Sequence, residues 1–296
     1  VINKDKSVVS REIRRNADAR SGQYKDDLAH RKYLKRQAYK AKARTFTPEV
    51  EAYVRDKLRL KYSPEQIAGA AKTNGDNCVS HERIYQFIWQ DKRKKGTLYL
   101  DLRNRGRRYK KRSVIYDKRG TIPNRTDISL RPPEVEQRER FGDLEIDLII
   151  GKNHKNAILT INDRATGLAK LCKLTGKDAE QLAVATIDCL KDWKPYLHTI
   201  TSDNGKEFSS HQMIATELNI DFFFAKPFAS WQRGSNENYN RLVRQYIPKK
   251  VDFDYVTHDY VKYVEQQLNN RPRKRFGYLS PNQIVSKVWN TLEKSG

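Results

Sequence analysis

Long apolar runs, paired cysteines and metal-binding spacings are scarce in this sequence. No stretch approaches the roughly 18 apolar residues of a membrane-spanning helix, and the opening VINKDKSVVS is too polar for a secretory signal peptide. The 3 cysteines, Cys78, Cys172 and Cys189, lie far apart, and the 6 histidines show no ligand spacing. We therefore expect no membrane segment, no disulfide framework and no structural zinc, a pattern typical of a reducing, cytoplasmic setting.

Negative charge is also in short supply relative to positive charge, and the excess of positive charge is concentrated in the first half of the chain. The formal net charge is +23, and residues 1–140 contain 37 of the 59 Lys and Arg but only 18 of the 36 Asp and Glu. The densest basic stretch, residues 92–112, has 11 Lys and Arg and one acid, Asp101. Because each neutralised phosphate releases counterions, such a stretch binds nucleic acid tightly. We predict a nucleic-acid partner, the alternative being an ordinary basic surface.

Four segments are expected from the length of 296 residues and the changes of pattern along it. Residues 1–44 are predicted to form a truncated helix-turn-helix and a connecting helix, and residues 45–112 a second helix-turn-helix with a basic extension. Residues 113–140, which contain three prolines and no lasting apolar stripe, are predicted to be a linker. Residues 141–296 are predicted to form an α/β domain with C-terminal helices.

The first helix-turn-helix is represented by one short amphipathic helix. Ser7 is a suitable N-cap, and the helix after it has an apolar side and a basic side, as a recognition helix in the major groove does. The helix that would support it is missing and the chain starts with Val1 rather than Met, so we expect a module cut from a longer protein. The alternative is an ordinary surface helix. The candidate DNA contacts are Arg11, Arg14 and Arg15.

The second module is predicted from three helical stretches: residues 46–60, a helix that opens at Ser63, and residues 79–89. The third helix presents polar side chains outward, as a recognition helix does. The alternative is a small helical spacer. The candidate DNA contacts are Ser80, His81 and Arg83 on the third helix, and Arg107, Arg108, Lys110 and Lys111 in the basic extension.

Beyond residue 140 the pattern changes to strands that alternate with helices. The predicted order is three strands, a helix, a strand, a helix, a strand and a long helix, which indicates a mixed α/β sheet with helices packed on it. The strands are expected at residues 145–151, 156–163, 166–174, 197–201 and 220–224, and the helices at residues 179–190, 211–218 and 235–246.

Three carboxylates occur where this pattern favours chemistry. Asp203 directly follows a strand, Asp147 lies in an otherwise apolar strand, and Glu237 falls in the first turn of the last helix. Acids from separate elements can hold two hard cations, which promote in-line phosphoryl displacement. Taken singly, the acids have simpler interpretations as a turn residue, a paired core carboxylate and a helix-dipole partner. Asp143 and Glu145 share a strand face with Asp147, which we prefer because it borders the apolar run.

Four segments of the chain resemble the bacterial DDE transposases of insertion-sequence family thirty. They are GDLEIDLIIG, TSDNGKEF, AKPFASWQRGSNENYNRLVRQY and LNNRPRKRFGYLSPNQI, and the resemblance extends over essentially the whole chain. It implies an RNase H-like, integrase-type catalytic domain in which Asp147, Asp203 and Glu237 are the catalytic and metal-binding acids. It also implies that Arg244, seven residues after Glu237, contacts substrate phosphate. The departures from the family pattern are Leu144 and Ile146, where Trp and Gly are expected.

The resemblance implies a transposase that binds the terminal inverted repeats of its insertion sequence and then cleaves and joins DNA strands. Two Mg²⁺ ions, with Mn²⁺ as a substitute, are the implied cofactors. The implied partners are double-stranded DNA, as inverted repeats and as target, and further copies of the chain in a homo-oligomer. The implied setting is the bacterial cytoplasm, in association with the nucleoid, and no membrane is expected.

Two other functions use part of the same pattern. A DNA-binding regulator with a non-catalytic sensing domain explains the basic half of the chain but not three acids in this arrangement. An RNase H-like nuclease for RNA/DNA hybrids uses the same metals but performs no strand transfer, and the tandem helix-turn-helix modules favour duplex DNA. Transposition of DNA is therefore the prediction.

Overall fold

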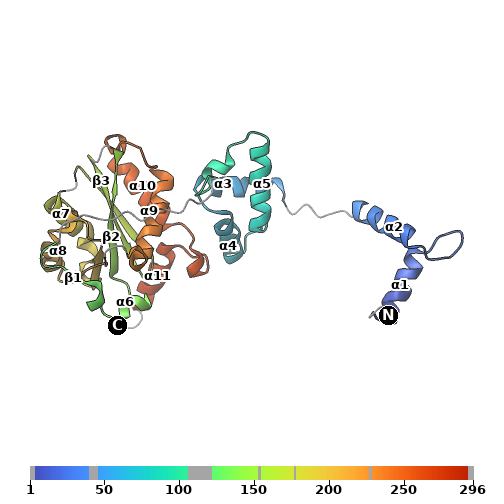
Figure 1. Cartoon of the computed structure of the whole chain (residues 1–296), viewed down its shortest axis with the longest axis horizontal. Coiled ribbons are helices and arrows are strands. Elements are labelled where there is room, and N and C mark those ends of the chain that lie inside the picture. The colour runs from blue at the N-terminus through green and yellow to red at the C-terminus, as the bar shows by residue number, and fades with distance from the viewer. Residues whose placement is uncertain are drawn as a thin grey trace. The chain divides into compact units, whose positions relative to one another are not determined.

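The computed structural model of the chain describes residues 4–39, 46–105, 122–152, 155–176, 178–226 and 229–292. They fall into two compact units, Val1–Thr47 and Pro48–Gly296, and each is described by itself (Figure 1). Within the described residues, no helix has the length and apolar composition that crossing a membrane requires.

The first unit contains two helices, α1 (Lys6–Asn16) and α2 (Asp26–Tyr39). Asp5, rather than the predicted Ser7, is the N-cap of α1, because its carboxylate accepts a hydrogen bond from the amide of Ser7 at 2.8 Å. Arg36 of α2 donates to the side-chain oxygen of Asn16 at 2.7 Å. This contact ties the end of α1 to α2.

The second unit begins with three helices packed around a small apolar core. They are α3 (Pro48–Arg59), α4 (Pro64–Asn74) and α5 (His81–Arg93), followed by the 3₁₀ turn η1 (Leu98–Asp101). Ser63 and Gln66 form a capping box at the start of α4, and Ser80 caps α5. Gly75 ends α4 with a φ of 78°, a left-handed conformation that glycine adopts without strain. The buried side chains of this core are Val50, Val54, Leu58, Ile67, Ala71, Ile84 and Ile88.

A 6-stranded mixed sheet with the order β1-β6-β5-β2-β3-β4 forms the centre of the remaining described residues. β2, β3 and β4 are antiparallel neighbours, whereas β5 pairs in parallel with β2 and β6, and β6 with β1. β2 to β6 correspond to the five predicted strands, but no sequence pattern predicts the short β1, which lies in the segment expected as a linker. The strands are β1 (Thr126–Asp127), β2 (Asp143–Ile150), β3 (Ala157–Asp163), β4 (Ala169–Leu174), β5 (Thr199–Ser202) and β6 (Asp221–Phe224).

Helices cover both faces of the sheet (Figure 1). Leu144, Ile146 and Leu148 of β2 pack in one core with α7 (Ala179–Leu190) and α8 (His211–Leu218). The neighbouring Ile149 packs in a second core with α9 (Gly234–Tyr246) and α10 (His258–Asn269). Because side chains alternate along a strand, the acids at the odd-numbered positions of β2 lie on the face that α9 covers. The other α-helices of the unit are α6 (Glu134–Gln137) and α11 (Pro281–Leu292).

The three-helix module α3–α5 contacts the loop that follows α10. Gln66 donates a hydrogen bond from Nε2 to the carbonyl oxygen of Pro272 at 2.7 Å. The ring of Tyr278 lies so close to α4 that a Cβ added at Gly69 would be 2.4 Å from it. Any side chain at Gly69 would therefore require the ring of Tyr278 to move.

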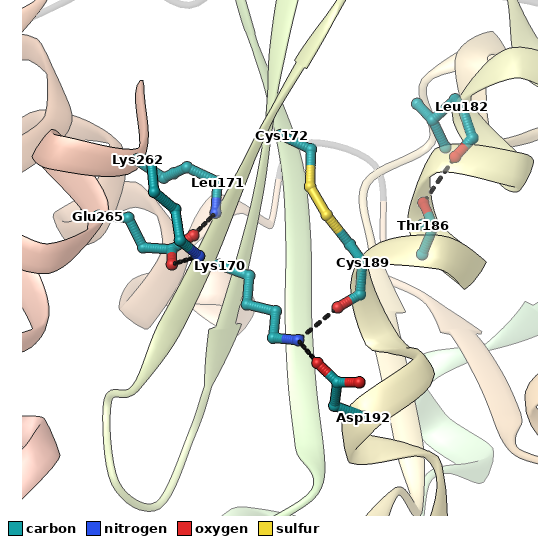
Figure 2. The surroundings of a disulfide bond; sticks show 9 residues. All are labelled: Lys170, Leu171, Cys172, Leu182, Thr186, Cys189, Asp192, Lys262 and Glu265. Carbon is teal, nitrogen blue, oxygen red and sulfur yellow. Dashed lines mark hydrogen bonds and ion pairs between the residues drawn. A yellow bond between two sulfur atoms is a disulfide. The ribbon is translucent and has the colours of Figure 1, made fainter. Parts of the chain in front are cut away.

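Two cysteines come together although their spacing predicts no disulfide. Cys172 on β4 and Cys189 on α7 form a disulfide (Figure 2). Lys170 of β4 donates to the carbonyl oxygen of Cys189 at 2.6 Å, so a hydrogen bond joins β4 to α7 beside the disulfide. The two cysteines meet because α7 packs across β4, which their separation of 17 residues does not reveal. The expectation of no disulfide is wrong for this pair, whereas Cys78 is a free cysteine.

Candidate active site

Strand β2 carries three carboxylates on the face that α9 covers, and two of them are fully engaged inside the fold. Asp143 is 1% exposed and accepts two hydrogen bonds from Arg140, at 2.7 and 3.1 Å. Glu145 is 0% exposed and forms an ion pair with the buried Arg164. The side chain of Asp147 is 23% exposed. Of the three acids, Asp147 alone offers its carboxylate to a ligand.

Asp147 is oriented by two hydrogen bonds and is partly desolvated. The amide of Leu148 donates to its Oδ1 at 2.9 Å, and Asn240 of α9 donates from Nδ2 to its Oδ2 at 2.8 Å. Burial raises the pKa of Asp147 to about 6; the charge of Arg233 opposes this rise and the charge of Asp203 adds to it. A carboxylate in such a setting is stabilised by a cation, and perturbed acids of this kind are typical of functional sites.

Strand β5 brings Asp203 alongside Asp147. In the parallel pair of β2 and β5, Glu145 is the partner of Thr201. Two residues further along each strand stand Asp147 and Asp203, and neighbouring strands are about 4.8 Å apart. Asp203 accepts a hydrogen bond from the amide of Gly205 at 3.0 Å, which turns the chain away after the strand. The two carboxylates therefore leave the same edge of the sheet together.

A guanidinium lies between these two carboxylates. Nη1 of Arg233 is 3.7 Å from Oδ2 of Asp147, and Nη2 is 3.6 Å from Oδ2 of Asp203. Nη1 also donates to the carbonyl oxygen of Ile146 at 3.2 Å, while Nε has no hydrogen-bond partner among the described residues. Arg233 ends the 3₁₀ turn η6 (Ser230–Arg233), directly before α9. Its charge compensates the two acids.

Glu237 lies in the first turn of α9 and is exposed. It stands four residues after Arg233 and three before Asn240. At this spacing on a helix, Glu237 is a neighbour of both residues that contact Asp147. In the part of the chain that the structure describes, no three His, Cys, Asp or Glu side chains are placed to hold one metal ion. The structure thus brings Asp147 and Asp203 together and leaves Glu237 apart from them.

The oxygen donors of the site suit a divalent cation. Mg²⁺ prefers oxygen ligands and is commonly held by one or two carboxylates together with substrate phosphates. Asp147 and Asp203 both lie within reach of one cationic group, as their shared contact with Arg233 demonstrates. Asp147 and Asp203 therefore offer ligands of the kind that a divalent cation takes, and Glu237 is the acid that α9 carries.

The chain is similar over nearly its whole length to insertion-sequence transposases. No family model matches it. The transposase for insertion sequence element IS4351 from Bacteroides fragilis is 53% identical over 289 residues, which cover 98% of this chain and 89% of that protein. Transposase InsI for insertion sequence element IS30A from Escherichia coli (strain K12) is 30% identical over 299 residues, which cover 97% of this chain and 77% of that protein. The chain belongs to the IS30 family of transposases.

This assignment confirms the resemblance that the four sequence segments indicate. Among solved structures, the catalytic core domain of BIV integrase matches 51% of the transposase and 97% of its own chain, with 18% identity and a TM-score of 0.41.

Apart from Arg244 on α9, the predicted DNA contacts of the transposase lie on α1, at the start of α5 and in a segment beyond the described residues. On α1 the three arginines are exposed: Arg11, Arg14 and Arg15. On α5, Ser80 accepts the amide of Arg83 as N-cap, Arg83 is half-buried, and the exposed His81 lies 2.9 Å from a carboxylate oxygen of Glu82. Four predicted contacts lie outside the described residues: Arg107, Arg108, Lys110 and Lys111.

Arg244 is turned toward the end of β2. Its Nη2 donates to the carbonyl oxygen of Ile150 at 2.8 Å, and its Nη1 to that of Pro248 at 3.5 Å. Burial lowers the pKa of Arg244, and its guanidinium also lies over the ring of Phe253 at 5.8 Å. The predicted phosphate contact is thus held against backbone carbonyls beside the site.

Three residues near the acids were not predicted from the sequence. Arg233 and Asn240 touch Asp147 from the start of α9, and the negative charge of Glu207 raises the pKa of Asp147. In the sequence, Arg233 and Asn240 are marked only by their helical spacing from Glu237, which places all three on one side of the helix. No spacing in the sequence connects Glu207 with β2.

Proposed function

We propose that this transposase binds the terminal inverted repeats of an insertion sequence and performs metal-dependent cleavage and transfer of DNA strands. The observation that supports the proposal is the convergence on one guanidinium of Asp147, from within β2, and Asp203, which directly follows the parallel strand β5. Helix α9, which carries Glu237, contacts the carboxylate of Asp147 through Asn240. Acids at such a position suit phosphodiester chemistry, which needs positive charge at the attacking and leaving oxygens.

Each residue of the site is assigned a role that fits its contacts. Asp147 and Asp203, joined by Glu237 of α9, would hold two Mg²⁺ ions, which would supply activation of the attacking oxygen and stabilisation of the leaving oxygen. Asn240 orients the carboxylate of Asp147 through its hydrogen bond. Arg233 keeps the two strand acids together and compensates their charge. The phosphate contact on the same stretch of α9 is assigned to Arg244.

Two phosphoryl transfers are proposed at this one site. In the first, water attacks the phosphorus at the end of the element, the bond to the 3′-oxygen breaks, and a 3′-hydroxyl is freed. In the second, this hydroxyl attacks a phosphodiester of the target DNA and displaces the 3′-oxygen there. The protein forms no covalent bond to the DNA in either step.

Recognition of the element ends is assigned to the helices before the sheet. The exposed arginines of α1 and the N-terminal turn of α5, with Ser80, His81 and Arg83, are the proposed contacts to the inverted repeats. The basic extension of residues 106–112 adds salt-sensitive affinity for the backbone. Because an insertion sequence has two ends, we assign the reaction to a homo-oligomer assembled on DNA.

The test is strand cleavage and joining by matched variants. The parent, Asp203→Asn and Glu237→Gln are incubated with a labelled duplex carrying the element end, in Mg²⁺, in Mn²⁺ and in EDTA. We expect the parent to nick and join DNA with either metal but not in EDTA, and both variants to bind the duplex without cutting it. Glu217→Gln, which removes an exposed acid of α8, should cut as the parent does. Cleavage by Asp203→Asn at the rate of the parent would contradict the proposal.

A further inference from the structure

A pocket of about 360 Å³ lies against α9 on the side away from the acids. Its wall includes Ser235, Asn238 and Leu242, which stand roughly half a helical turn from Arg233 and Asn240. The volume falls within the range of ~300–1,000 Å³ that is usual for ligand sites. One helix thus separates the candidate active site from a second concave site.

Positive charge surrounds this pocket. It is lined by five basic residues and by no Asp or Glu: Arg103, Arg138, Arg273, Lys274 and Arg275. Lys274 has a partner, Glu65, at 2.6 Å, but no carboxylate in the described part of the chain forms an ion pair with the four arginines. Burial lowers the pKa of Arg273 to about 10, and the charges of Arg275 and Arg103 lower it as well. Four arginines that line one pocket without an ion-pair partner among the described residues favour the binding of an anion, although the buried Asp163 and Glu145 offset part of the charge of Arg275.

Two residues that line the pocket carry a buried hydroxyl without a hydrogen-bond partner among the described residues. The hydroxyls are the buried Oη of Tyr239, a residue that is 2% exposed, and the buried Oγ of Ser235. Buried polar groups in folded proteins are hydrogen-bonded in the great majority of cases. Burial raises the pKa of Tyr239, so its hydroxyl keeps its proton and can donate it to an acceptor. Both hydroxyls are donors without a partner, and they belong to residues that line the same pocket as the arginines.

Gly234 and Ser235, the first two residues of α9, line the same pocket, while the amide of the next residue, Asn236, donates to Oε2 of Glu145 at 2.9 Å. The helix is 13 residues long, and the residue at its N-cap position, Arg233, makes no side-chain capping bond. Gly234 lines the pocket, and a Cβ added there would meet no atom within 4 Å. The N–H groups at the start of a helix carry partial positive charge and bind anions.

We propose that this pocket binds a backbone phosphate of the DNA duplex. A phosphodiester carries one negative charge, and its oxygens accept hydrogen bonds from guanidinium and hydroxyl groups. Arg103 links the pocket to the helical module, since its Nη2 donates to Oδ1 of Asn238 at 2.9 Å. A phosphate held here fixes a DNA strand on one side of α9, while Glu237 and the strand acids act from the other. The inference rests on the proposed function, because it requires DNA as the ligand.

The salt dependence of DNA binding tests the pocket. Fluorescence anisotropy of a labelled element-end duplex is measured at several salt concentrations for the parent and for Arg138→Gln with Arg275→Gln. The control is Lys191→Gln with Lys194→Gln, which removes two exposed charges that do not line the pocket. For one lost phosphate contact we expect the slope of log K against log salt to fall by about 0.9, and the affinity to weaken about eightfold at ~0.1 M salt. The control should keep the slope of the parent.

Tyr239→Phe provides a second, independent variant. It removes only a hydroxyl that has no partner among the described residues, so we expect weaker DNA binding at an unchanged melting temperature. Parental affinity and slope in both this variant and the double arginine variant would overturn the pocket proposal. A parent that binds no duplex would instead overturn the proposed function, and the pocket proposal with it, so the two failures are distinguishable.

Two further arms separate a DNA phosphate from a free one. A single neutral methylphosphonate linkage, moved along the duplex, should weaken binding by the parent at one position and have no effect there on the double arginine variant. If the methylphosphonate leaves DNA binding by the parent unchanged at every position, the proposal is overturned. Excess inorganic phosphate at constant ionic strength should leave the DNA affinity of the parent unchanged. Displacement of DNA by inorganic phosphate from the parent alone would overturn it in favour of a free-anion site.

Discussion

At the residue scale, the site depends on charges placed where water is partly excluded. Burial raises the pKa of Asp147 to about 6, and Arg233, between the two strand acids, opposes that rise. Arg233→Gln removes this charge, so we predict a pKa of Asp147 above that of the parent. An NMR titration of the Asp147 carboxyl carbon in EDTA measures it. Arg241→Gln, an exposed change on the same helix, should leave the value unchanged, and equal values in Arg233→Gln and the parent would contradict the contact.

A second buried acid predicts a pH dependence of folding. Asp163 accepts hydrogen bonds from the amides of Gly142 and Thr166, yet burial raises its pKa from 3.8 to about 6. The folded state then binds the proton more tightly than the unfolded state. The contribution of this group to stability is therefore fully present below about pH 3.8 and is lost as the pH rises through about 6. That loss amounts to up to about 3 kcal/mol, at about 1.4 kcal/mol for each pKa unit.

Urea unfolding at several pH values between about 4 and 7 measures this effect. Asp163→Asn cannot titrate, so its free energy of unfolding should change less over this range than that of the parent, whatever its absolute value. The comparison of slopes is independent of any hydrogen bond that the amide loses. Identical slopes for the two proteins would mean that Asp163 titrates normally in the fold.

The sequence predicts some of these residues and not others, for a physical reason. Strand patterns place Asp147 within a strand and Asp203 directly after one, because alternation and turn residues are local signals. The contacts of Arg233 and Asn240 with Asp147 depend on how α9 crosses β2, which periodicity does not specify. The exposed position of Glu237 depends on the same crossing.

At the element scale, pairing and packing decide which predicted pieces meet. β2 to β6 have enough residues to show a pattern, whereas β1 (Thr126–Asp127) is too short to show one. The sequence also does not specify the register between paired strands. A slip of one residue between β2 and β5 would turn Asp203 away from Asp147. The pairing of Cys172 with Cys189 likewise follows from the packing of α7 on β4 and not from any motif.

Two glycines with positive φ test how tightly the elements are joined. A Cβ at Gly142, φ 103°, would be 1.8 Å from the carbonyl oxygen of Tyr196, whereas one at Gly75, φ 78°, would meet no atom within 4 Å. We predict that Gly75→Ala lowers the free energy of unfolding by about 1 kcal/mol. Gly142→Ala should lower it by at least about 3 kcal/mol or prevent folding, because backbone must move at the start of β2. Urea unfolding followed by circular dichroism compares them, and equal losses would contradict the close approach at Gly142.

At the scale of the whole molecule, the helical module and the sheet domain belong to one unit, Pro48–Gly296. Gln66 is central to their contact. Its Nε2 donates to the carbonyl oxygen of Pro272 at 2.7 Å, and its Oε1 accepts from Nε of Arg271 at 3.1 Å and from the amide of Ser63 at 2.9 Å. Composition and periodicity predict the two parts separately, but a contact made by one amide side chain leaves no repeating signal in the sequence.

Gln66→Ala tests whether this contact couples the two parts. The change leaves the carbonyl of Pro272 and Nε of Arg271 without this partner, a loss of about 1–3 kcal/mol. We predict one calorimetric transition for the parent and, in the variant, earlier melting of the helical module than of the sheet domain. Gln86→Ala, an exposed change on α5, should melt as the parent does. An unsplit transition at the parental temperature would mean that this contact does not couple the two parts.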